Sequence, residues 1–172
     1  GWQGGRVGGA IYGSSYYTIV DGPSWTNAEA NSITFGGHLV TINNADENDW
    51  LVKTFKDEDL AYNLENTHPI HLNTYWTGLR RDNSKSAWKW SSRSNTEYRN
   101  FGPKEPYNGL QYAVINTQQD GDFKDADPNW WGNHYGSWAD YGRSTDRLYG
   151  IAEIPLSYFS IEDASFREGK GG

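Results

Sequence analysis

The chain contains no cysteine, so its fold must be held without disulfide bonds, and thiolate catalysis and cysteine-based zinc sites are excluded. It has nine tryptophans and twelve tyrosines among its 172 residues. Large aromatic side chains bury much apolar area per residue, and those left at the surface offer flat faces to a ligand. We therefore expect a core rich in aromatic rings, with some rings exposed.

Length and charge narrow the class of protein. A chain of 172 residues is long enough for one domain with a sizeable core. The 22 acidic and 15 basic residues give a formal net charge of −7, which disfavours nucleic acid and anionic membrane surfaces as partners. No apolar run approaches the roughly 20 residues that a membrane-spanning helix needs. We expect a neutral or cationic ligand, no nucleic acid and no membrane insertion.

Local patterns in the first part of the chain predict a strand and then a helix. The strand covers residues 15–20 and ends in a glycine-proline turn. The helix can begin at Ser24 or at Thr26, and Thr26 would form a capping box with Glu29. Two glycines at positions 36–37 supply a left-handed stop.

A second helix is predicted shortly afterwards. It follows an expected strand at residues 38–42 and begins at Asn44, with Glu47 at the third helical position. The apolar residues that follow Asn44 recur near helical spacing. The first part of the chain is therefore expected to be helix-rich.

From residue 76 onward, short apolar runs alternate with turn residues, which is typical of a sheet. The expected strands are residues 76–79, 87–90, 112–116, 136–140 and 148–154, and the first two form a hairpin around Asp82. Two long segments poor in aliphatic residues, 91–109 and 118–135, lie between them. Long irregular segments inside a compact domain are usually functional or disordered, and their aromatic residues favour order.

Two carboxylates in this second part suggest a metal site. Glu105 directly precedes Pro106, and Asp140 follows Trp138 near the end of an expected strand. Calcium takes 6 to 8 oxygen ligands and prefers charged ones, so two such carboxylates can converge on one ion. The structural alternatives are a surface carboxylate at Glu105 and a strand-end cap at Asp140.

Seven short motifs occur along the chain in a fixed order. They are residues 25–29, 36–43, 47–51, 76–79, 105–106, 138–140 and 151–153. In this order they resemble the C-type lectin-like domain, and the match runs from about residue 12 to residue 154. The resemblance implies an α+β fold, with two helices packed on small antiparallel sheets and a long loop region that holds calcium and ligand.

The resemblance also implies functional residues. It places a Ca2+ ion at Glu105 and Asp140, with Asn108 as a shifted third ligand, and it implies a cis bond before Pro106. The chain departs from the family pattern because Tyr107 and Ala139 stand where amide ligands are usual. The predicted ligand-binding residues are Glu105, Tyr107, Asn108, Trp131, Tyr135 and Asp140.

A second possible calcium locus is an acidic run in the long segment after residue 117. Its four carboxylates repel one another unless they are solvated or bridged by a cation. The spacing does not match an EF-hand, and a solvated loop is the alternative. The residues concerned are Asp120, Asp122, Asp125 and Asp127.

No enzyme is expected, because no catalytic triad order, phosphate-binding loop or paired carboxylates of a glycosidase are evident.

Residues 161–169 resemble the opening of a Calx-beta domain. We therefore assign residues 1–156 to a lectin-like domain and residues 157–172 to a linker and the start of a Calx-beta-like module, or to a polar tail.

The leading functional hypothesis is a calcium-dependent carbohydrate-binding module of a large secreted bacterial adhesin, with a glycan or cell-surface glycoconjugate as partner. One alternative is a lectin-like module that binds protein, peptide or an ordered surface and uses calcium only structurally. A ligand-free spacer is the third.

Overall fold

The computed structural model describes residues 9–56, 74–117 and 126–159. Within these residues the chain forms a mixed α+β fold, which confirms the expected class. The strands are β1 (Ala10–Tyr12), β2 (Ser15–Val20), β3 (His38–Leu39), β4 (Thr74–Arg80), β5 (Lys89–Trp90), β6 (Tyr112–Asn116), β7 (Trp138–Tyr141) and β8 (Gly150–Pro155). The helices are α1 (Trp25–Thr34), α2 (Ala45–Phe55) and the short 3-10 helix η2 (Trp131–Asn133).

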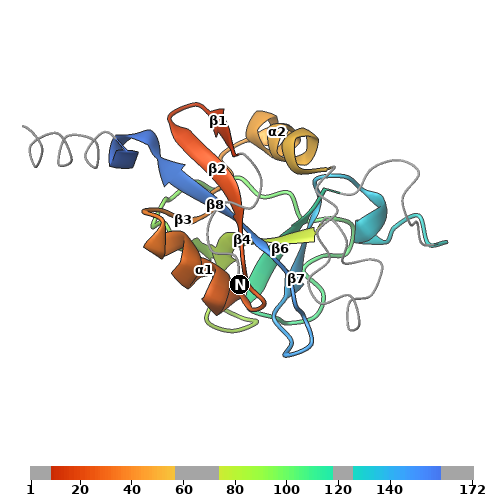
Figure 1. Ribbon diagram of the computed structural model, residues 1–172. Helices are drawn as coiled ribbons and strands as arrows, with labels where there is room; N and C mark the ends of the chain where they lie inside the picture. The colour runs from red at the N-terminus through yellow and green to blue at the C-terminus, as the bar shows by residue number, and fades with distance from the viewer. Residues whose placement is uncertain (1–8, 57–73, 118–125, 160–172) are drawn as a thin grey trace, which may run out of the picture.

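The strands form one sheet in the order β1-β2-β8-β4-β6-β7, with β3 added to β8 and β5 added to β4. The β4–β8 pairing is parallel, and the other strand pairs are antiparallel. Figure 1 shows α1 and α2 on opposite sides of the central strands. None of the described helices is long and apolar enough to cross a membrane.

The sheet separates two hydrophobic cores. Leu51 and Phe55 of α2 pack with Tyr75 and Trp138 on one side. Trp25 of α1 packs with Trp76, Trp131 and Tyr141 on the other. The rings meet mostly edge to face, as in the pair of Trp138 with Trp90 at 5.8 Å. The described core is therefore as aromatic as the composition predicts, and it fixes both faces of β7.

The helix boundaries follow from local capping. Ser24 caps α1 by accepting the N–H of Asn27, and Asn44 caps α2 by accepting the N–H of Glu47. The capping box expected for Thr26 and Glu29 is wrong, because Glu29 instead accepts the N–H of Leu39 at 2.8 Å. Glu29 thus joins α1 to β3 and does not close the first turn of the helix.

The expected strands are present but differ in length. The ladders of β2 and β6 match the expected ranges, whereas β3 covers only two residues and the hairpin partner β5 only two. Strand β1 was not expected. It pairs with β2 through Ala10 and Tyr17. Two X-Pro bonds are cis: the expected one before Pro106 and an unexpected one before Pro23.

Candidate functional site

The loop after residue 101 folds onto the carboxylate of Asp140 in β7. Asp140 is fully buried. Its Oδ1 accepts the N–H of Tyr107 at 3.0 Å, its Oδ2 accepts the N–H of Leu110 at 2.7 Å, and the N–H of Asn108 lies 3.2 and 3.1 Å from the two oxygens. One carboxylate therefore organises the peptide groups of the whole turn.

A guanidinium group completes the surroundings of Asp140. Arg81 follows β4 directly and is 7% exposed. Its Nη2 lies 3.4 Å from Oδ2 of Asp140, and its Nε donates to the carbonyl of Leu110 at 2.8 Å. The guanidinium carbon also stacks 4.3 Å from the ring centre of Trp88, a cation–π geometry. Arg81 thus joins the end of β4 to the loop and to β7.

These contacts determine the charge state of Asp140. Burial alone would raise the pKa of Asp140, but the hydrogen bonds from Leu110, Asn108 and Tyr107 outweigh burial and hold the pKa below its ordinary value. Asp140 is therefore an ionised, fully engaged acceptor at neutral pH.

Glu105 lies beside Asp140 and is in the opposite situation. Its Oε1 is buried and has no hydrogen-bond partner among the described residues. Burial raises the pKa of Glu105 to about 7, and a side-chain hydrogen bond with Asp140 and the repulsion between the two carboxylates add to the effect. Near neutral pH, the Glu105 carboxyl group is therefore poised between its neutral and ionised forms.

Glu105 lines a pocket of about 280 Å³ between two loops. One wall comes from Lys104, Glu105 and Tyr107, and the other from Asp127, Trp130 and Trp131. We call this the loop pocket. Most of its lining surface is apolar, while two carboxyl groups, an asparagine and a lysine supply polar groups.

The aromatic residues at the loop pocket differ in exposure. Tyr107 is 76% exposed, whereas Trp131 is 6% exposed and packs edge to face against Tyr141 at 5.7 Å. Trp130 is half-buried, and its ring lies 6.1 Å from that of Trp131. Tyr107 is therefore the ring most available for stacking, and Trp131 can contribute only the part that reaches the pocket.

The structure brings some of the predicted site residues together. Glu105, Tyr107 and Asn108 lie in one turn, which is hydrogen-bonded to Asp140 of β7. Glu105, Tyr107 and Trp131 line the loop pocket, whereas Asn108 and Asp140 do not. Tyr135, which is 38% exposed, is not among the residues that line it. Asp127 does line it, and its Oδ1 accepts the N–H of Asn129 at 2.9 Å. Three further predicted metal ligands lie outside the described residues: Asp120, Asp122 and Asp125.

The arrangement at Asp140 does not fit a calcium ion. A carboxylate offers about four lone-pair positions, and those of Asp140 face four N–H groups. Ala139 has no side-chain ligand to offer, and the nearby cation is already Arg81. Across the described ranges, no group of three or more His, Asp or Glu side chains is placed to hold a metal. Calcium at Glu105, Asn108 and Asp140 thus stays a prediction of the resemblance alone.

Sequence patterns did not indicate Arg81 or Lys104 as residues of the site. Arg81 sits two residues after the expected strand at 76–79, and its only local signal is a neighbouring arginine. Its main partners, Leu110 and Asp140, are 29 and 59 residues away. No short-range pattern encodes such contacts.

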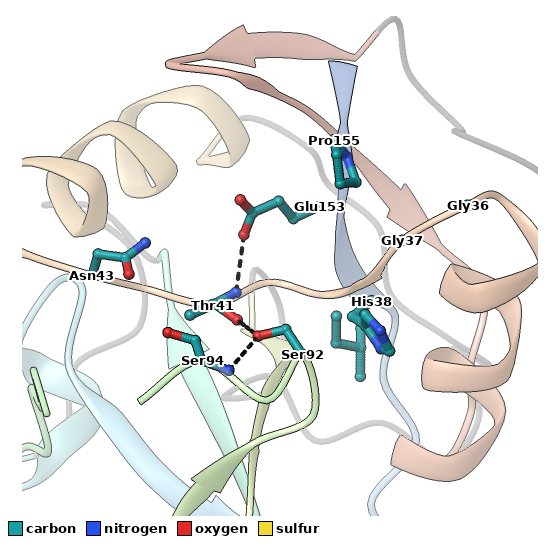
Figure 2. Close-up of a pocket in the computed structure, with 10 residues that line it drawn as sticks. Gly36, Gly37, His38, Thr41, Asn43, Ser92, Ser94, Glu153 and Pro155 are labelled. Atoms are coloured by element: carbon teal, nitrogen blue, oxygen red, sulfur yellow. Dashed lines mark hydrogen bonds between the residues drawn. The ribbon is translucent and has the colours of Figure 1, made fainter. Parts of the chain in front are cut away.

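A second, larger pocket of about 420 Å³ lies near α1 and the end of β8 (Figure 2). Several of its polar groups bind one another: Oε1 of Glu153 accepts the N–H of Thr41 at 3.1 Å, and the hydroxyls of Thr41 and Ser92 are 2.5 Å apart. Glu105, which lines the loop pocket, instead has a buried Oε1 without a hydrogen-bond partner among the described residues. The loop pocket is therefore the better candidate for ligand binding.

Known proteins share this fold and parts of this sequence. A model of the Lectin C-type domain family matches residues 21–141. A perlucin-like protein of Mytilus galloprovincialis is 28% identical over 94 residues, which are 54% of this chain and 54% of that protein. The chain spans between about a third and a half of the curated relatives it matches.

Two solved structures show how far the likeness extends. Human lithostathine has a TM-score of 0.65 at 18% identity, covering 86% of this chain and 97% of lithostathine. The cow C-type carbohydrate-recognition domain of CD23, solved in the presence of an oligosaccharide, has a TM-score of 0.59 at 17% identity. The match covers 86% of this chain and 92% of the CD23 domain. These likenesses define the class of fold. With the family match over most of its length, the chain belongs to the C-type lectin domain family.

Proposed function

We propose that this domain binds a carbohydrate in the loop pocket through its own side chains. The observation that carries the proposal is the buried, unpartnered Oε1 of Glu105 beside the exposed ring of Tyr107. A sugar presents hydroxyl groups to a carboxylate and C–H faces to an aromatic ring, so these two groups match its chemistry. Family membership supports carbohydrate as the ligand class.

The charges around the loop pocket favour a neutral ligand. Glu105 and Asp127 supply acidic groups, and Lys104 is the one basic residue that lines the pocket among the described residues. The whole chain carries a formal charge of −7. An uncharged glycan avoids the repulsion that this net charge would impose on an anionic one.

The finer parts of the functional hypothesis rest on the sequence. Secretion and a place in a bacterial adhesin with a following Calx-beta-like module are proposals drawn from the resemblance, which also implies a calcium-dependent sugar site. The N–H groups that bind Asp140 leave no position for a calcium ion at this carboxylate. We therefore propose that the sugar contacts protein side chains directly and is not bound through calcium.

The test is a glycan array followed by calorimetry of the best ligand, in calcium and then in chelator. We expect binding in both buffers. Tyr107→Ala and Glu105→Gln should each weaken binding about tenfold or more, which corresponds to about 1.4 kcal/mol. The matched control for charge is Glu97→Gln, on an exposed residue outside the loop pocket, and it should leave affinity unchanged.

Tyr135→Ala separates the sequence prediction from the structural one. Tyr135 does not line the loop pocket, so we expect no loss of affinity. An array with no bound glycan in either buffer would contradict the proposal and would favour binding of protein, peptide or an ordered surface, or a spacer role.

A further inference from the structure

We infer that Arg81 is the cation that orders the ligand loop, and that the loop therefore does not require calcium. The inference concerns how residues 102–110 are held, and it stands whether or not the loop pocket binds a sugar.

Arg81 makes separate contacts with several segments. Its Nε donates to the carbonyl of Leu110 at 2.8 Å, its Nη1 to the carbonyl of Ser84 at 3.2 Å, and its Nη2 lies 3.4 Å from Asp140. Its backbone N–H also donates to the carbonyl of Gln111 at 2.9 Å. A planar guanidinium presents five N–H groups in a fixed fork, so one side chain can hold all three acceptors at once.

The burial of the pair makes the charge compensation necessary. Arg81 is 7% exposed and Asp140 is fully buried. A buried charge without a partner is strongly unfavourable, so each of these groups requires the other. The ring of Trp88 covers the guanidinium at 4.3 Å and helps to exclude water from it.

The peptide N–H groups of the loop occupy the acceptor positions of the Asp140 carboxylate that Arg81 leaves free. The N–H groups of Tyr107, Asn108 and Leu110 all point to its two oxygens, at 2.7 to 3.2 Å. A metal ion at this carboxylate would have to displace these donors or repel Arg81. The loop is thus built around a hydrogen-bonded carboxylate and an internal guanidinium, which stays charged throughout the physiological pH range.

The first test measures thermal stability in calcium and in chelator. A ligand that binds the folded state raises the melting temperature, so a calcium site would be visible directly. We expect the wild-type Tm to differ by less than about 1 °C between 5 mM calcium and excess chelator, where about 1 °C corresponds to well under 1 kcal/mol for a chain of this size.

Calcium could also act at another place on the chain, and Glu105→Gln distinguishes the two cases. Stabilisation by calcium that disappears in Glu105→Gln would place the ion at the loop and overturn the inference. Stabilisation that persists unchanged in Glu105→Gln would place the ion elsewhere and leave the inference standing.

The second test measures the coupling between the two charges. Arg81→Met and Asp140→Asn should each lower Tm, on the order of 10 °C, because each leaves a buried partner uncompensated. The double variant should lose clearly less than the sum of the two single losses. Strictly additive losses would overturn the inference.

Two further variants test whether the loss of Tm comes from removing the guanidinium group and not only from removing a large side chain. Arg81→Lys keeps the charge but loses the fork, so we expect a loss smaller than that of Arg81→Met and still measurable. Arg80→Met is the matched control, because Arg80 is partly exposed and pairs with the exposed Asp82, and it should change Tm by only a degree or two. Equal losses for Arg81→Met and Arg80→Met would contradict the inference.

Discussion

Among the described residues, two clusters that contain carboxylates use their oxygens differently. The first, which we call the helix-side cluster, contains Tyr17, Glu47 and Glu153. Glu47 accepts from the Tyr17 hydroxyl at 2.6 Å and from the Asn43 N–H at 2.7 Å, and Glu153 accepts from Ser15 at 2.9 Å and Thr41 at 3.1 Å. The second, the loop-side cluster, contains Arg81, Glu105 and Asp140.

The two clusters differ in whether every carboxylate oxygen accepts a hydrogen bond. In the helix-side cluster, each of the four carboxylate oxygens accepts a hydrogen bond from a neutral group. In the loop-side cluster, Asp140 is fully engaged while Oε1 of Glu105 has no partner among the described residues. A buried acceptor left without a donor costs free energy, which a ligand hydroxyl can recover. A cluster of acidic residues is therefore not enough to indicate a binding site. At Glu105 the indication is a carboxylate oxygen without a hydrogen-bond partner in a residue that lines a pocket.

Among the variants that compare the two clusters here, the largest effect is expected from breaking the helix-side cluster with Glu47→Gln. Glu47 is 3% exposed and accepts from the Tyr17 hydroxyl as well as from the backbone and side chain of Asn43. Hydrogen bonds to a charged acceptor contribute about 1.5–3 kcal/mol, so we expect a loss of about 2–3 kcal/mol in urea unfolding. Asp49→Asn, an exposed change on the same helix, should cost less than about 0.5 kcal/mol. Equal losses for the two variants would refute a structural role for the cluster.

A smaller effect is expected from pH. The pKa of Glu105 is raised from 4.5 to about 7, so between these values the folded state binds more protons than the unfolded state. The stabilising contribution is therefore complete below about pH 4.5 and is lost as pH rises through 7. Because Glu105 as a whole residue is only partly buried, solvent screening limits the loss to about 1 kcal/mol.

Glu105→Gln isolates this contribution. Burial also raises the pKa of Glu153, so the wild-type profile contains a second component of the same sign. The difference between wild type and Glu105→Gln, measured by urea unfolding from pH 4.5 to 8, should fall by about 1 kcal/mol over that range. A difference that does not change with pH would show that Glu105 titrates normally.

The smallest effect on stability is expected from Tyr107→Ala. The Tyr107 side chain is 76% exposed, and its main structural contact is its backbone N–H, which the variant retains. We expect a change within about 0.5 kcal/mol in urea unfolding, although the same variant should weaken glycan binding. A large loss of stability would show that the ring supports the loop and would weaken its assignment to ligand contact.

The parts of the fold that sequence predicted are those set by local rules. Ser24 and Asn44 cap the two helices, and Gly36 has the positive φ of 99° that a helix stop requires. The β6 ladder matches its expected range, because its apolar run is bounded by polar residues. Such features depend on neighbours within a few residues.

The parts that sequence did not predict depend on distant partners. The convergence of Glu105 with Asp140 was expected from the two carboxylates and from the family resemblance, but no side-chain pattern predicts that three peptide N–H groups bind Asp140. Arg81 could not be distinguished from Arg80 in the sequence, yet Arg81 is buried against Asp140 while Arg80 faces solvent beside Asp82. The tertiary path of the loop decides which of two adjacent arginines becomes structural.

The pairing of β2 with β8 has a mechanical consequence. Ser15 pairs with Pro155, and the ring of Phe159 packs on Tyr16 at 5.7 Å, so the start of β2 and the end of β8 lie side by side (Figure 1). Tension applied along the chain would load the β1–β2–β8 edge one hydrogen bond at a time. The loop pocket lies near β6 and β7, at the edge of the sheet opposite β1 and β2. A bound ligand would therefore stay bound until the pairing of β2 with β8 had broken.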